Sequence, residues 1–142
     1  MTSENLQAAG LTRRLAAMLY DTLLLTGVLF VATAIAVAIN RGHAVSHPLY
    51  YLTLAAITYV FFCWFWINGG QTLGMRTWRL KLVSLSHKEI TWNQATQRFL
   101  LSIAGLLPFG AGLLWLLFDS DNLALYDRLS SSKIVFLPKR HN

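Results

Sequence analysis

The sequence predicts an all-α membrane protein with two transmembrane helices, a third helical tract interrupted by Pro and Gly, and a small two-stranded β element. Three observations support this prediction. Charged residues make up 13% of the chain, whereas an average soluble domain has roughly 25%. The charges are segregated, since the apolar stretches contain almost none and the connections contain several. Two short segments outside the apolar stretches have strand character. The length of 142 residues leaves room for one domain, residues 1–142.

The first apolar stretch covers residues 15–39. As a helix it would extend about 37 Å, which exceeds the roughly 30 Å hydrocarbon core of a bilayer. Its first turns are therefore expected among the lipid headgroups. The stretch has 25 residues and contains Asp21, whereas the apolar part of a signal peptide has roughly 7–15 residues, so we expect a retained span. The polar residues before Leu11 are expected to be frayed.

Two further apolar stretches follow. Residues 49–67 have aromatic residues at both ends, as suits the two interfaces of a bilayer: Tyr50, Tyr51, Trp64, Phe65 and Trp66. Residues 99–118 are long enough for one span, but their middle contains Pro108, Gly110 and Gly112. Pro and Gly at membrane depth kink or break a helix, so this tract is expected to be interrupted.

The β element is predicted from alternation of polar and apolar residues. Residues 79–86 largely alternate, which is typical of a strand, and residues 87–89 would form its turn. A second strand-like piece, residues 133–137, lies before Pro138. An isolated strand is unstable in water, so the two segments are expected to pair with each other.

The distribution of Lys and Arg predicts the orientation of the spans. Two basic residues precede the first span, one lies in the connection 40–48, five lie in the segment 68–98, and four lie in the tail 119–142. The first three counts predict a cytoplasmic N-terminus, an external first connection and a cytoplasmic second connection. We therefore expect a protein of a bacterial-type inner membrane, with the basic residues that flank its spans beside anionic lipid headgroups.

The tail decides between two forms of the third tract. If the tract crossed fully, four basic residues would lie outside and the bilayer would separate the two strands. We therefore favour a helical hairpin that turns at residues 108–112, with arms at about 92–107 and 111–128. A kinked single crossing remains the alternative.

Asp21 is the most informative single residue. A carboxylate at the centre of a span costs on the order of 2.5–3.5 kcal/mol, and less near the end of the span, where Asp21 lies. Arg14 is seven residues earlier and therefore on the same helix face, although roughly 10 Å away along the axis. Asp21 could be solvated at the interface, helped by the positive end of its helix, or it could handle an ion or substrate.

Other candidates are weaker. Gln71 and Thr72 lie among glycines whose backbone N–H groups could face an anion, with Arg76 adding positive charge. The segment lacks the spacing of a phosphate-binding loop, so a tight turn that leaves the second span is favoured. Arg98 opens the third tract and is expected to extend to the headgroups. His43 and His47 lack further ligands, so no metal or other cofactor is expected, and the lone cysteine, Cys63, excludes an internal disulfide.

Three blocks of sequence resemble the RDD family of small bacterial membrane proteins. They are the segment from Arg13 to Asp21, the glycine-rich segment from Gly70 to Arg76, and Leu125-Tyr126-Asp127-Arg128-Leu129-Ser130 with the strand that follows. The family's usual His before the last Asp is Tyr126 here. The blocks occur in order and cover residues 10–137, which makes them specific together although each is weak alone.

The resemblance implies that Arg14, Asp21 and Asp127 are the residues that give the family its name. Asp127 would be either a solvated or Arg-paired carboxylate at a helix end, or part of one polar cluster with the other two. The family implies a three-segment membrane domain, and some members are proposed to exchange monovalent cations for protons. An oligomeric cation/proton antiporter or transport-related subunit is therefore one hypothesis. A non-catalytic scaffold or lipid-recognising subunit of a larger membrane complex is the alternative. No enzyme activity and no nucleic-acid partner are expected.

Overall fold

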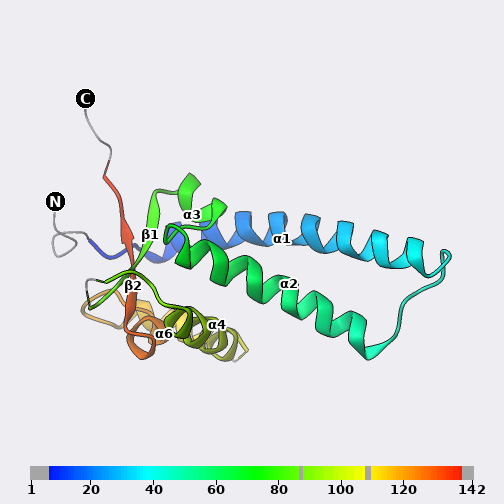
Figure 1. Cartoon of the computed structure of the whole chain (residues 1–142). Coiled ribbons are helices and arrows are strands. Elements are labelled where there is room, and N and C mark those ends of the chain that lie inside the picture. The colour runs from blue at the N-terminus through cyan, green and yellow to red at the C-terminus, as the bar shows by residue number, and fades with distance from the viewer. Residues whose placement is uncertain (1–6, 87, 108–109, 139–142) are drawn as a thin grey trace.

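Two long helices form an antiparallel hairpin that dominates the computed structural model, which describes residues 7–86, 88–107 and 110–138. Helix α1 is Leu11–Ile39 and helix α2 is Pro48–Ile67. Both are long and apolar enough to cross a membrane, as predicted. Figure 1 shows them side by side, joined at the end farthest from the termini. We call the opposite end, where the strands lie, the sheet end.

Local sequence explains where these helices begin and how they meet. Gly10, in extended conformation, precedes α1. Helix α2 begins with Pro48, which suits a first helical turn, and the His47 side chain accepts a hydrogen bond from the backbone N–H of Leu49. The hydroxyl groups of Thr33 and Tyr50 lie 2.8 Å apart and connect the two helices near their far end.

The two predicted strands pair, which confirms the β element. Strand β1, Leu80–Ser84, runs antiparallel to strand β2, Ser132–Phe136, so that Leu80 faces Phe136 and Ser84 faces Ser132. Residue 87, in the predicted turn, lies outside the described residues. Short helix α3, Leu73–Thr77, connects α2 to β1 and packs on α1.

The N-terminal segment joins the sheet, which was not predicted. The backbone N–H of Phe136 donates to the Gln7 carbonyl at 2.9 Å, and the N–H of Ala9 donates to the Ile134 carbonyl at 2.9 Å. The expectation that the chain is frayed up to Leu11 was therefore wrong for residues 7–10. Both ends of the described chain thus lie at the sheet end (Figure 1).

The third tract is broken, as predicted from Pro and Gly. Helix α4 is Trp92–Leu106, and helix α5, Ala111–Leu114, continues as the 3-10 helix η2, Trp115–Leu117. The axes on the two sides of the break differ in direction by 102°. Gly110, at the start of α5, has a φ of 73°, which glycine adopts without strain. Residues 108 and 109 lie outside the described part.

Helix α4 begins seven residues earlier than the apolar tract itself. The Thr91 side chain accepts from the backbone N–H of Gln94, and the Gln94 side chain accepts from the backbone N–H of Thr91. This reciprocal cap makes polar residues the first turn of the helix. After η2 the chain reaches short helix α6, Leu125–Leu129, which leads directly into β2.

The main apolar core lies at the sheet end, where it joins the N-terminal segment, the first helices, both strands and α4. Its buried members are Ala9, Ala17, Cys63, Trp66, Met75, Leu80, Leu82, Ile90, Ala95 and Ile134. By contrast, the most apolar part of α1 is not buried by the rest of the chain. Such an exposed apolar surface suits lipid contact, so the protein concentrates its own packing at one end.

Candidate functional site

A buried carboxylate at the sheet end is paired with two arginines. Arg14 Nη1 lies 2.5 Å from Asp127 Oδ2, and Arg98 Nη1 lies 2.6 Å from Asp127 Oδ1. The Asp127 side chain is fully buried, and Oδ2 also accepts from the backbone N–H of Ala124 at 3.1 Å. Helices α1, α4 and α6 are thereby connected through one side chain. Both oxygen atoms of this carboxylate thus accept from a guanidinium group.

Both arginines are held by further contacts. Arg14 Nε donates to the Ala9 carbonyl at 3.0 Å, which fixes the side chain against the N-terminal segment. Arg98 Nη1 also donates to Ser132 Oγ at 3.0 Å, and its guanidinium lies 5.4 Å from the Trp66 ring and 5.1 Å from the Tyr126 ring. Cations over aromatic faces are attracted by the ring quadrupole.

Arg98 is the largest correction to the predicted side-chain positions. We expected it to extend to the headgroups, but it is 2% exposed and directed toward Asp127. The reason is that Asp127, 29 residues away in the sequence, offers it an ionised partner inside the protein. The ion pair with Asp127 compensates for the hydration that the Arg98 guanidinium loses when it is buried.

Asp21 is also buried, but its partners are neutral. Its Oδ1 accepts from the backbone N–H of Gly74 at 2.9 Å, and its Oδ2 accepts from the Thr72 hydroxyl. Thr72 at the same time caps α3 by accepting from the N–H of Met75. Among the described residues no Lys or Arg pairs with Asp21, which distinguishes it from Asp127.

Close contact between α3 and α1 positions these donors. A Cβ atom placed at Gly74 would overlap the Ala17 carbonyl oxygen and lie 2.9 Å from the carboxyl carbon of Asp21. Only glycine therefore lets the backbone N–H of α3 approach the carboxylate. The glycine-rich segment thus contributes a backbone N–H donor at Gly74, which the absence of a side chain allows to approach Asp21.

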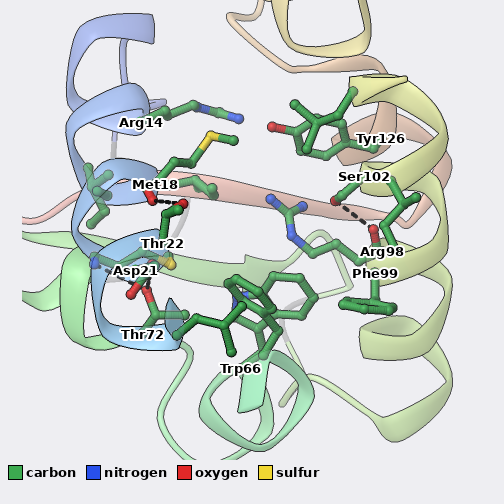
Figure 2. A pocket seen from close by; sticks show the side chains of 18 residues that line it. Arg14, Met18, Asp21, Thr22, Trp66, Thr72, Arg98, Phe99, Ser102 and Tyr126 are labelled. Carbon is green, nitrogen blue, oxygen red and sulfur yellow. Dashed lines mark hydrogen bonds between the residues drawn. The ribbon is translucent and has the colours of Figure 1, made fainter. Parts of the chain in front are cut away.

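A cavity of about 290 Å³ lies between these groups. Figure 2 shows α1 with Arg14 and Asp21 on one side, α4 with Arg98 on the other, and Trp66 of α2 between them. Most of the wall is apolar, with contributions from Met18, Leu25, Phe62, Phe99, Ile103 and Leu106. Arg14, Asp21 and Arg98 thus line one cavity, whereas Asp127 is not among its lining residues.

The remaining predicted residues have other positions. Gln71 Nε2 donates to the Leu80 carbonyl at 2.7 Å, which fastens the loop to β1. Arg76 is exposed on α3 and lies outside the cavity wall. Trp66 and Tyr126, which flank Arg98, were not predicted as site residues. No local sequence signal separates Trp66 from an ordinary core aromatic, whereas Tyr126 stands at the position of the family's usual His, which could have indicated it. Burial raises the pKa of the Tyr126 phenol above its ordinary value, and the nearby Arg98 charge partly opposes this rise.

Comparison with known proteins identifies the family. The model of the RDD family matches residues 8–131, which is most of the chain. No curated protein and no solved structure matches. The match includes Arg14, Asp21 and Asp127, the residues that the sequence blocks singled out. The chain belongs to the RDD family and is a membrane-protein domain with two apolar helices of membrane-spanning length.

Proposed function

We propose that this protein exchanges monovalent cations for protons across the inner membrane, as an oligomer whose N-termini are cytoplasmic. Asp21 is the carboxylate that holds the cation or the proton. One observation carries the proposal: Asp21 is buried in a membrane-length apolar helix and lines a cavity, and its described hydrogen-bond partners, Thr72 and Gly74, are both neutral. Ionisable residues in such positions commonly mark ion and proton pathways.

The chemistry around Asp21 supports alternate occupancy. Carboxylate and hydroxyl oxygens are the ligands that hard cations prefer, and Thr72 supplies the hydroxyl. A hydroxyl can donate to a carboxylate or accept from a carboxylic acid, so Thr72 can serve both protonation states. Because a proton and a cation compete for the same oxygen atoms, binding of one releases the other.

Asp127 has a different part in this proposal. Both of its oxygen atoms are engaged by arginines, so it connects the helices. We also propose that the third tract turns back to the sheet end, which is supported by the pairing of β2 with β1. A pathway across the whole bilayer then needs more than one protomer, because the cavity lies at one end of the hairpin.

Exchange in proteoliposomes tests the proposal. The full-length protein, reconstituted with a pH-sensitive dye inside the vesicles, is expected to move protons when a sodium or potassium gradient is applied. Asp21→Asn should abolish this movement, because an amide neither ionises nor binds a cation strongly. Asp121→Asn is the matched control and should retain exchange, since Asp121 is exposed and outside the cavity wall. Undiminished exchange in Asp21→Asn would overturn the proposed role.

A second candidate is a non-transporting subunit that scaffolds a partner or recognises lipid headgroups, with no enzyme activity and no nucleic-acid partner. The observation that favours it is the exposed apolar surface of α1, which offers room for helices of another membrane protein. Purification in mild detergent separates the candidates. Recovery of this chain alone, as a homo-oligomer, argues against a scaffold.

A further inference from the structure

Arg98 has an unused hydrogen-bond donor inside the cavity wall. The side chain is 2% exposed, and Nη1 is engaged by Asp127 and Ser132. Nε is buried and has no acceptor among the described residues. Leaving a buried charged donor without an acceptor is energetically costly, so a ligand that supplies an acceptor would bind here favourably. Figure 2 shows the guanidinium extending from α4 into the cavity, between Trp66 and Tyr126.

The charge on this wall favours an anion. Arg14 and Arg98 share the single carboxylate of Asp127, which leaves one positive charge in excess there. The carboxylate that lines the cavity, Asp21, belongs to the α1 wall and accepts from Thr72 and Gly74. An anionic group would therefore be drawn to the α4 wall, where Arg98 lines the cavity. A carboxylate or phosphate oxygen is the acceptor that guanidinium donors bind most strongly.

The rest of the cavity is apolar and reaches the lipid-facing surface. Buried residues such as Leu80 form its deep end, near the strands. Its other lining residues include Thr22 of α1 and Ile103 and Leu106 of α4, which are exposed. The cavity thus opens sideways between α1 and α4, at a level where both helices are apolar. A ligand that fits has a charged head at the sheet end and a hydrocarbon chain that leaves toward the bilayer.

We propose that the cavity binds an acyl-chain amphiphile with an anionic head, the head on Arg98 and the first part of the chain against Phe99, Ile103 and Leu106. The volume of about 290 Å³ suits a head and a chain segment rather than a complete two-chain lipid. A free fatty carboxylate and an anionic phospholipid share this chemistry. The inference does not depend on ion exchange by Asp21.

Quenching of tryptophan fluorescence by brominated acyl chains tests the inference. The full-length protein is placed in nanodiscs of neutral phosphatidylcholine and titrated with a brominated fatty acid, the fatty alcohol of the same chain, or brominated phosphatidylglycerol. We expect saturable quenching by an anionic probe and not by the alcohol. The Trp66→Phe variant should lose that quenching, because Trp66 lines the cavity. Quenching by the acid alone identifies a free fatty acid, and quenching by phosphatidylglycerol identifies a membrane lipid.

Three substitutions separate head recognition from general lipid contact. Arg98→Lys keeps a positive charge for Asp127 but removes Nε, and should weaken binding of the anionic probe about tenfold or more, as expected for one charge-assisted hydrogen bond. Ile103→Phe should narrow the opening and weaken binding, whereas Leu100→Phe, on the same helix but outside the cavity wall, should bind normally. Any of three results would overturn the inference. They are equal binding of the acid and the alcohol, equal binding by Arg98→Lys and the wild type, and the absence of saturable binding.

Discussion

Two aspartates of the same family motif differ in their surroundings, and this difference determines what each can do. Asp127 is bound by two guanidinium groups, and Asp21 by a hydroxyl and a backbone N–H. The arginines already supply the counter-charge of Asp127, whereas a carboxylate with neutral donors can take up a proton or a cation. In the proposed exchange, Asp21 is therefore the residue that binds the proton or the cation.

Replacement of Asp127 by Asn should destabilise the protein strongly. The substitution leaves two buried guanidinium groups without their counter-charge, and breaking a buried ion pair costs about 3–5 kcal/mol. We expect a clear loss of thermal stability in detergent, measured by the unfolding transition of the purified protein. Asp121→Asn, on the exposed surface, should unfold like the wild type. Equal stability of the two variants would contradict the anchoring role of Asp127.

Gly74 offers a second test at the scale of single residues. Gly74→Ala would force the Ala methyl group against the Ala17 carbonyl and displace the N–H that binds Asp21, so a destabilisation of about 1–3 kcal/mol is expected. Gly27→Ala is the matched control, because that position in α1 has open space around a Cβ and Ala favours a helix. Denaturation of both variants in detergent should show a loss for Gly74→Ala alone. A neutral Gly74→Ala would mean that α3 does not depend on this close approach.

At the scale of elements, local signals predicted the two long helices, the two strands and the break in the third tract. Hydropathy and alternation depend on near neighbours in the sequence, so one chain is enough to recognise them. Hydropathy alone places the start of the third tract at residue 99, but the hairpin arm predicted at about 92–107 agrees with the observed bounds of α4, Trp92–Leu106. The cap formed by Thr91 and Gln94 explains why this helix begins with polar residues.

Contacts between distant segments could not be predicted in the same way. The pairing of residues 7–9 with β2 and the contact of Arg98 with Asp127 depend on which elements come together in space. For Arg98, headgroups and an internal carboxylate were both physically acceptable partners. The family motif identified Arg14 and Asp127, but their direct ion pair became visible only in the fold.

At the scale of the whole molecule, both ends of the chain build one structure at one end of the helical hairpin. The N-terminal segment pairs with β2, and Arg14 of α1 pairs with Asp127 of α6. If α1 and α2 cross the bilayer, all of these segments must lie on one side of it, and the connection 40–47 on the other. In the proposed hairpin arrangement, the bent third tract returns the chain to the starting side.

Labelling of single cysteines with a membrane-impermeant maleimide tests this arrangement most directly. In a Cys63→Ala background, cysteines are placed one at a time at Gln7, Ser131 and His43, all of which are exposed. If both chain ends lie at the same end of the helical hairpin, Gln7→Cys and Ser131→Cys are labelled from the same side of the membrane, and His43→Cys is labelled only from the opposite side. Labelling of Ser131→Cys and His43→Cys from the same side would contradict it, because Asp127 could then not reach Arg14.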